Sequence, residues 1–377
     1  MPRPALVSIV LTAVLVVGCA PAAVPSAPTP ARSISTPAPS EPHATTTATP
    51  TAEVTPSPTA PPTDAVPVAW HRLSLDTAPS DREDHTWTVD PSSRLAYLFG
   101  GRAGSNVRGD LWVFDLAIDM WRRLGPAGPS PKARFGHEAV WVDGLGLVIW
   151  AGQAGPTTFF DDLWAYDPVA NQWNRLQNDG ARPVARYGSC AAIGPDGRLW
   201  ISHGFTEDGT RFADTRAYDF PSGKWTNETP AGRAPVNRCL HGCWWTDDGR
   251  FALYAGQTTG VQALGDLWAL RGAGAPDASW DQVDAGLPAD RNLYAFARRA
   301  DSIVVFGGRG RGSAYHRDVF AIDAVSMAIR RIRPAGPQPA GRSGATLIDD
   351  PAGGRLLLFG GRRAIGALAD AWELILP

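Results

Sequence analysis

A short motif recurs six times along this chain, and its period constrains the fold more than any other feature. An aspartate, in most copies followed by an apolar residue, returns every 52 residues, at Asp110, Asp162, Asp214, Asp266, Asp318 and Asp370. A glycine that ends an apolar run and an upstream arginine keep nearly the same spacing. A period of about 50 residues is typical of proteins built from copies of one supersecondary unit. The sequence therefore predicts six such units.

Each unit carries four segments with strand character, and the second copy is a clear example. Residues 138–142 and 147–150 are apolar runs separated by Asp143-Gly144, a dipeptide that favours a tight turn. After a polar loop, residues 162–167 alternate between two faces, and residues 172–176 form a fourth short segment. No helical period is present, so each unit is expected to be a four-stranded antiparallel meander.

The repeated motifs resemble those of the kelch repeat. The resemblance rests on an Arg-x-Gly-His opening, an apolar strand that ends in Gly-Gly and an Asp-Leu-Trp strand, and it covers residues 68–376. The clearest copies are 98–101 with 110–112, and 358–361 with 370–372. The resemblance implies an all-β fold, a six-bladed kelch-type β-propeller, in which ring closure leaves only short and protected sheet edges.

The two ends of the repeat region complement each other. The last copy stops after its third strand, at residues 370–374, whereas residues 68–73 have the fourth-strand pattern with no strands before them. We expect residues 68–73 to complete the sixth sheet by pairing beside 370–374. Such pairing closes the ring and removes an exposed edge at the seam.

The first 66 residues differ in composition from the repeats. Residues 1–19 comprise a weakly basic start, an apolar stretch and Cys19, which follows small residues. This segment resembles a bacterial lipoprotein signal in which Cys19 is lipidated; the alternatives are an ordinary signal peptide or an apolar start on a cytosolic protein. Residues 20–66 hold 12 prolines among mainly Ala, Thr and Ser, and are expected to be a disordered linker ahead of the propeller at 67–377.

These features predict an exported protein, lipid-anchored on the outer side of the cell membrane or in the periplasm or cell envelope. The proline content of the linker favours an extended chain that holds the propeller away from the membrane. The formal net charge of −2 provides no general attraction to nucleic acid or to anionic lipid. We therefore expect no nucleic-acid partner, membrane contact through the Cys19 lipid alone, and a monomer.

The candidate ligand-binding face is the one that carries the loops between second and third strands. An arginine that opens each innermost strand is expected to lie on this face around the central channel: Arg82, Arg134, Arg186, Arg238, Arg291 and Arg342. The loops add the cations Arg102, Arg309 and Arg311 and the aromatic residues Phe159, Phe205 and Tyr315. Because arginine is suited to bidentate binding of carboxylates and phosphates, this face is expected to bind an anionic ligand.

The six repeated arginines also fit a scaffold role, in which they bond to backbone carbonyls or to the repeated aspartates and hold the blades in place. A binding site is rarely sixfold, whereas a structural contact in a six-part ring commonly is. The repeated aspartates are expected to accept hydrogen bonds from backbone amides of the adjacent turn. Positions at which the copies differ are better candidates for recognition, because the fold does not require the difference.

Three histidines, His85, His137 and His241, share one repeat position, which in the other copies holds Ser189, Tyr294 and Ala345. This interchange indicates a polar position that faces the channel. A metal site is not expected, because the blades that carry the histidines are not all neighbours. No cofactor is expected either.

Three cysteines lie on the innermost strands of the third and fourth copies. Cys239 and Cys243 are four residues apart on one strand, which is too far for a disulfide between them. Cys190 could pair with either one, and an exported protein permits such a bond.

The sequence favours a surface-anchored module that binds an extracellular or cell-wall ligand, either a protein or a glycan. The alternative is a carbohydrate-active enzyme of the kelch type, similar to copper alcohol oxidases or sugar epimerases. The copper chemistry needs a Tyr, His and Cys set that His203, Tyr254 and Cys190 do not convincingly provide. A scaffold of the periplasm or wall is the third hypothesis.

Overall fold

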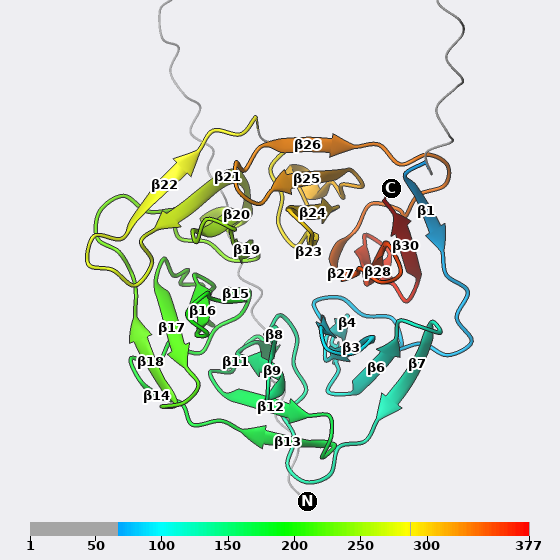
Figure 1. Cartoon of the computed structure of the whole chain (residues 1–377), viewed down its shortest axis with the longest axis horizontal. Coiled ribbons are helices and arrows are strands. Elements are labelled where there is room, and N and C mark those ends of the chain that lie inside the picture. The colour runs from blue at the N-terminus through cyan, green and yellow to red at the C-terminus, as the bar shows by residue number, and fades with distance from the viewer. Residues whose placement is uncertain (1–66, 287, 377) are drawn as a thin grey trace, which may run out of the picture. The chain divides into compact units, whose positions relative to one another are not determined.

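The computed structural model describes residues 67–286 and 288–376, which form six mainly antiparallel sheets of four or five strands, arranged as blades around a central axis (Figure 1). Besides strands, this part of the chain contains two short 3-10 turns, η1 at Thr259–Val261 and η2 at Arg311–Ser313. No helix within these ranges is long and apolar enough to cross a membrane. The expected all-β, six-bladed propeller is confirmed. The predicted signal segment, Cys19 and the linker lie outside the described residues.

Each blade runs from an innermost strand beside the axis to an outermost strand. Blade 1 consists of β2 (Thr86–Asp90), β3 (Leu95–Phe99), β6 (Leu111–Asp115) and β7 (Met120–Leu124). Blade 2 consists of β8 (Glu138–Val142), β9 (Gly146–Trp150), β12 (Leu163–Asp167) and β13 (Gln172–Arg175). Blade 3 consists of β15 (Cys190–Ile193), β16 (Leu199–Ser202), β17 (Thr215–Asp219) and β18 (Lys224–Asn227), with β14 (Asp179–Gly180) along its outer edge.

The second half of the ring repeats this plan. Blade 4 consists of β19 (Gly242–Trp245), β20 (Phe251–Thr258), β21 (Gln262–Arg271) and β22 (Ser279–Val283). Blade 5 consists of β23 (Ala295–Arg299), β24 (Ser302–Phe306), β25 (Val319–Asp323) and β26 (Ile329–Ile332). Blade 6 consists of β27 (Ser343–Asp350), β28 (Arg355–Arg363), β30 (Ala371–Ile375) and β1 (Ala69–Arg72). Short strands in the loops are β4 (Arg102–Ala103), β5 (Asn106–Val107), β10 (Gln153–Gly155), β11 (Thr158–Phe159) and β29 (Gly366–Ala367).

The apolar runs of the sequence form the second strand of each blade, where both sides are covered. In β9 every residue from Gly146 to Trp150 is buried. The third strand is more selective, since Leu163 and Ala165 of β12 are buried and Trp164 is partly exposed. A strand in the middle of a sheet that packs between two neighbouring blades has no solvated face, which explains the continuous apolar run.

The apolar core is divided among the interfaces between neighbouring blades. Tryptophans of the fourth strands supply much of it, and all five are buried: Trp70, Trp121, Trp173, Trp225 and Trp280. Trp173 of blade 2, for example, lies in one cluster with Tyr97 and Phe99 of blade 1. Each blade therefore buries its large aromatic residues against the blade before or after it.

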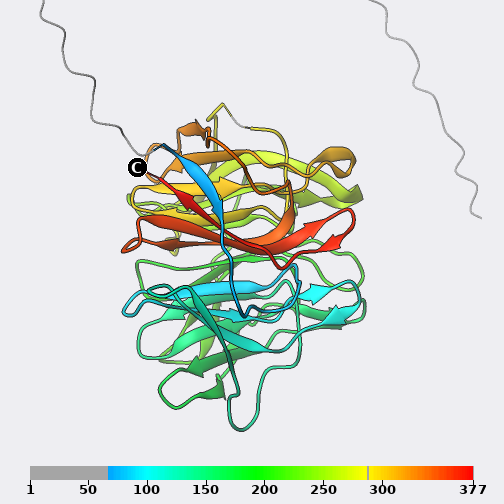
Figure 2. The same ribbon diagram turned by 90° about the vertical axis from the view of Figure 1, so that its right-hand side faces the viewer.

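The ring is closed by the segment that precedes the first repeat. β1 pairs antiparallel with β30, with Trp70 opposite Leu374 and Arg72 opposite Trp372. Figures 1 and 2 show β1, in blue, beside β30, in red, so the two ends of the propeller share one sheet. The expected completion of the sixth sheet by residues 68–73 is confirmed.

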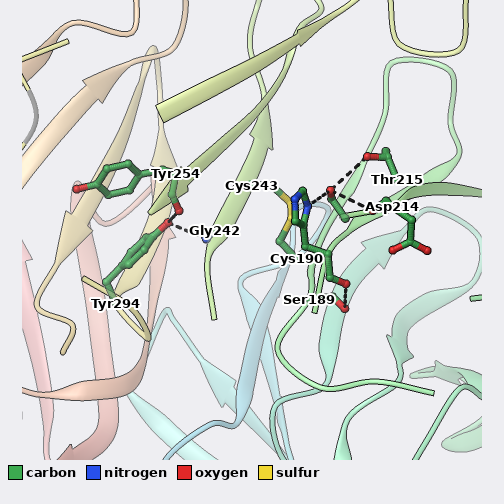
Figure 3. Close-up of a disulfide and its surroundings, with 10 residues drawn as sticks. Ser189, Cys190, Asp214, Thr215, Gly242, Cys243, Tyr254 and Tyr294 are labelled. Carbon is green, nitrogen blue, oxygen red and sulfur yellow. Dashed lines mark hydrogen bonds between the residues drawn. A yellow bond between two sulfur atoms is a disulfide. The ribbon is translucent and has the colours of Figure 1, made fainter. Parts of the chain in front are cut away.

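A disulfide links the innermost strands of blades 3 and 4. Cys190 of β15 is bonded to Cys243 of β19, with Cα atoms 5.6 Å apart (Figure 3). Cys239 is a free and buried thiol. The two pairings that the sequence left open are thereby resolved in favour of Cys243, which projects from its strand toward blade 3.

Candidate functional site

The six repeated arginines form a buried framework inside the blades. The guanidinium of Arg186 donates to both carboxylate oxygens of Asp214, at 2.6 and 3.1 Å, and to the carbonyl of His203 at 2.9 Å. The other five arginines contact the aspartate of their own blade in the same way. All six are buried, and their aspartates are partly exposed.

These contacts favour the scaffold interpretation of the arginines over the expected role in ligand binding. An arginine whose donors are occupied by a carboxylate and a carbonyl of its own blade has little capacity left for a ligand. Burial alone would raise the pKa of Asp214, but the hydrogen bonds and charge of Arg186 outweigh it and lower that pKa. The aspartates thus accept mainly from arginine rather than from turn amides.

Two aromatic residues of the loops cover this framework. Phe160 stacks on the guanidinium of Arg134 at 4.1 Å, and Phe212 stacks on that of Arg186 at 4.0 Å. Both occupy the position two residues before the aspartate, so that position belongs to the packing of the blade.

A ring of six backbone hydrogen bonds surrounds the central axis on the same face. Its members lie two positions after each arginine, and each amide donates to the carbonyl of the preceding member at 2.7–3.1 Å: Asp84, Gly136, Gly188, Leu240, Leu293 and Gly344. All six have left-handed backbone conformations, with φ between 50° and 64°. Each blade is thereby joined to both neighbours at the channel mouth.

Side chains fill the centre of this ring. The Tyr187 ring lies over Gly136, where a Cβ would come within 1.8 Å of it, so only glycine fits there. The Tyr187 hydroxyl reaches across to Asp84 at 3.2 Å. Leu240 packs over Gly188 in a similar way. The ring and these side chains together close the central channel toward the loops.

A buried acidic pair lies where blade 1 meets blade 6. Asp84 contacts Arg102 at 3.1 Å, and Glu83 contacts Arg102 at 3.4 Å and Arg362 at 3.2 Å. Burial and the neighbouring Asp84 raise the pKa of Glu83 to about 7. Arg102, which was expected to face a ligand, is therefore largely committed to these carboxylates, and its side chain is 28% exposed.

The loop face is divided into two parts by the residue that follows the repeated glycine at the end of each apolar run. Blades 5, 6 and 1, which are consecutive around the ring, have Arg309, Arg362 and Arg102 there. Blades 2, 3 and 4 have Gln153, Phe205 and Gln257. We call the loops 309–317, 362–369 and 102–109 the cationic arc, because they also carry Arg311, Arg317, Arg363 and Arg108.

Some arginine side chains of the cationic arc form ion pairs, and two exposed ones form none within the described part of the chain. The side chain of Arg311 is 81% exposed and pairs with Asp290 at 2.6 Å, and Arg108 pairs with Asp81 at 3.5 Å. Arg317 and Arg363 are exposed, and no described residue forms an ion pair with either. Tyr315 is partly buried, and its backbone pairs with that of Arg309.

Blades 2 and 3, which follow the cationic arc around the ring, carry a row of aromatic rings on the loop face, which we call the aromatic arc. Phe159 contacts Phe205 with ring centroids 5.8 Å apart, Phe205 contacts Tyr187 at 5.0 Å, and Tyr187 contacts Phe135 at 5.6 Å. Phe159 and Phe205 are partly exposed, whereas the other two are buried. The structure thus brings together the two phenylalanines singled out in the sequence.

The three repeated histidines lie between blades rather than around a common centre. His137 packs edge-on against Phe99 of blade 1 and bonds to the Thr86 hydroxyl at 2.9 Å, while His241 packs against His203 of blade 3. Burial lowers the pKa of His137 to about 3. Within the described residues, no group of three or more His, Cys, Asp or Glu side chains is placed to hold a metal. Cys190, considered for copper chemistry, is in the disulfide.

Sequence reasoning missed Glu83, Asp84 and Tyr187. A departure from the repeat could have indicated this site, because the other five copies have Gly or Leu at the position of Asp84. The positions of their partners could not be read from the sequence, because Tyr187 and Arg362 come from other blades.

Comparisons with known proteins agree with this architecture. A family model described as the KLHDC2/KLHL20/DRC7 Kelch-repeats domain matches residues 63–256 and 146–297. Adagio-like protein 3 of Oryza sativa subsp. japonica is 28% identical over 243 residues, covering 60% of this chain and 38% of that protein. The leucine-zipper-like transcriptional regulator 1 homolog of Drosophila melanogaster is 27% identical over 238 residues, covering 57% of this chain and 24% of that protein. The matches thus span well under half of either relative.

A solved structure described as the structure of YjhT is similar in fold. The TM-score is 0.61 with 16% sequence identity, and the match covers 79% of this chain and 95% of that one. At this identity the similarity concerns the fold alone.

Proposed function

We propose that this chain, which belongs to the kelch-repeat family, is a binding protein whose ligand docks on the loop face. Kelch propellers generally serve as protein-interaction modules. The observation that carries the proposal is the division of that face into a cationic and an aromatic arc. Both arcs consist of residues at which the copies differ. The fold does not require these differences, so recognition is the simplest reason for them.

The two arcs suggest the chemistry of the ligand. Exposed arginines such as Arg317 and Arg363 attract carboxylates or phosphates and speed encounter with an acidic partner. Phe159 and Phe205 offer a partly exposed apolar surface on blades 2 and 3 of the same face, and aromatic residues are enriched at binding hot spots. We propose an acidic protein segment as the ligand, with an acidic glycan as the alternative that the experiment separates.

The binding proposal predicts salt-dependent affinity for an acidic polymer. We expect the full chain to bind immobilised poly-L-glutamate at low ionic strength, and the triple variant Arg311→Ser/Arg317→Ser/Arg363→Ser to bind about tenfold more weakly, since each exposed charge contributes up to about 1 kcal/mol. Polygalacturonate in parallel tests the glycan alternative. Surface plasmon resonance at several salt concentrations measures both.

A matched control is available on the outer edge of blade 5. Arg330→Ser/Arg331→Ser/Arg333→Ser removes the same number of exposed charges from the region of β26. This variant is expected to bind nearly as well as the unmodified chain. Equal losses in the two triple variants would mean that net charge, and not the loop face, determines binding.

We propose further that the propeller is exported and anchored by a lipid on Cys19. The sequence of residues 1–19 supports this, and so does the Cys190–Cys243 disulfide, because disulfides persist mainly in oxidising compartments. A tethered propeller outside the membrane would meet ligands of the envelope or the cell exterior.

Replacement of the lipidation residue tests the anchor. In a bacterial host, Cys19→Ala is expected to move the protein out of the detergent-extracted membrane fraction and to abolish incorporation of radiolabelled palmitate, because one acylated residue supplies the membrane affinity. Cys239→Ala, which removes a buried free thiol, serves as the control and should leave the membrane fraction unchanged. Palmitate incorporation that persists in Cys19→Ala would refute the proposal.

A further inference from the structure

A cavity lined by both polar and apolar side chains lies inside the propeller beneath the hydrogen-bonded ring. Its volume is about 250 Å³, and members of the ring, among them Asp84, Leu240 and Gly344, form its end toward the loops. The ring is closed by hydrogen bonds between its own backbone groups and is covered by Tyr187, so the cavity is separate from the loop face.

The cavity opens toward the opposite face of the propeller. It shares Trp87, Thr88 and Ala139 with a second hollow of about 540 Å³. That hollow extends to Asp90 and Asp349, which lie at the hairpins between first and second strands. A small molecule would therefore enter from the hairpin side.

Glu138 is the carboxylate in this cavity that has no partner. It is the first residue of β8, which pairs with β9 on one side only and has its other edge toward the axis. No hydrogen bond or ion pair to its carboxylate is found among residues 67–286 and 288–376. The side chain is partly buried, and the space it reaches is the cavity. An ionised carboxylate held this way lacks the compensation that buried charges normally have.

Glu138 is also a departure from the repeat. The corresponding residues of the other blades carry no charge: Thr86, Cys190, Gly242, Ala295 and Thr346. Side chains of an extended strand alternate, and Cys190 points to blade 4, so the equivalent Glu138 points to blade 3 and Ser189. The Ser189 hydroxyl donates to the His203 carbonyl, so it does not compensate the charge of the Glu138 carboxylate.

We propose that the central cavity is a second binding site, specific for a small organic ammonium ion whose counter-ion is Glu138. One carboxylate with nearby hydroxyl groups is too few ligands for a tightly bound metal, whereas it matches a single positive charge. The aromatic residues Trp87, Tyr294 and Phe296 line the same cavity and suit the apolar part of an alkylammonium ion. This site is independent of the function proposed for the loop face.

The proposal predicts a defined pH dependence. Burial raises the pKa of Glu138 to about 8, so the carboxylate is mainly protonated at pH 7 and mainly ionised at pH 9. A ligand of fixed positive charge should bind about tenfold more tightly at pH 9, in proportion to the ionised fraction. The other titratable groups that line the cavity are Asp84, His85, His137, Tyr187, His241 and Tyr294.

The histidines and tyrosines among these groups do not change charge in that interval. Burial keeps the three histidines neutral, because it holds the pKa of each below its ordinary value. Burial likewise raises the pKa of Tyr187 and of Tyr294 above 10. Asp84 is bonded to Arg102 and Tyr187 at the closed end, and burial raises its pKa.

Choline and its uncharged isostere 3,3-dimethylbutan-1-ol are the probes for this site. The full chain is titrated with each by calorimetry at pH 7 and pH 9, with tryptophan fluorescence as a second readout because Trp87 lines the cavity. We expect choline to bind, with the tenfold gain at pH 9, and the isostere to bind at least ten times more weakly. Equal binding of the two probes, or no binding of choline, would overturn the proposal.

Glu138→Gln keeps the size of the side chain and removes its charge. This variant is expected to lose at least tenfold in choline affinity and all of the pH dependence, whereas Glu207→Gln, an exposed glutamate of the loop face, should change neither. If choline binding and its pH dependence persist in Glu138→Gln, the proposal is wrong. Should Glu138→Gln fail to fold, Glu138→Asp must still show pH-dependent binding, and the two-probe comparison on the unmodified chain stands by itself.

Discussion

Replacing Trp70 with alanine is expected to lower the free energy of unfolding by about 3–5 kcal/mol, which is the usual cost of removing a large buried aromatic side chain. Trp70 is 2% exposed and contacts Phe306 of blade 5 with ring centroids 5.2 Å apart. It also belongs to a cluster that joins blades 5 and 6. The loss of stability should therefore arise at the interface between blades 5 and 6, where the ring is closed. Chemical denaturation followed by circular dichroism measures it.

The next residue along β1 provides the control. His71 is exposed and pairs only through its backbone with Glu373, so His71→Ala should change the free energy of unfolding by less than about 0.5 kcal/mol. Similar losses in the two variants would mean that β1 contributes through its backbone and not through the buried tryptophan.

Replacing Asp266 with alanine is expected to destabilise the propeller by about 3–5 kcal/mol, because it leaves the charge of Arg238 buried without a counter-ion. Asp266 accepts from Arg238 at 2.6 and 2.8 Å and from the indole of Trp268 at 2.7 Å. Asp281→Ala in the same blade is the control, since Asp281 is half exposed in a surface pair with Arg271 and should cost less than about 1 kcal/mol. Thermal and denaturant unfolding compare the two.

The double variant Arg238→Met/Asp266→Leu identifies the cause of that loss. If the uncompensated charge is responsible, removal of both partners should recover part of the stability. The pH dependence has a defined sign as well. Burial alone would raise the pKa of Asp266, but the bonds from Arg238 lower it below 3.8. The contribution of the pair is therefore present above pH 4 and is lost as the pH falls below it. An unchanged difference between wild type and Asp266→Ala at pH 3 would contradict this account.

The repeat was sufficient to predict the architecture because its period counts the blades directly. The orphan strand at 68–73 and the incomplete last copy predicted the closure by the same counting. The period could not predict contacts between copies, however. Whether Cys190 would meet Cys239 or Cys243, and that Tyr187 would reach Asp84 of blade 1, depends on which way side chains point across a blade interface.

In the candidate site, too, the sequence predicted where residues lie but not which groups they contact. The sequence placed Arg186 and its five equivalents near the channel but could not decide between a ligand and the framework, because both roles use the same guanidinium. The decisive feature is the aspartate 28 residues further along the chain, which folding brings to 2.6 Å. Arg102 was expected to be available to a ligand, and the buried Glu83 and Asp84 engage it instead.

Hydrogen–deuterium exchange of the full chain, with and without poly-L-glutamate, tests the claim that recognition takes place on the loop face. The account predicts protection in the loops of the two arcs, chiefly 309–317, 362–369 and 205–213, and none in the hairpin turns at 143–146 and 246–250. Protection of those hairpin turns with the loops unaffected would contradict it.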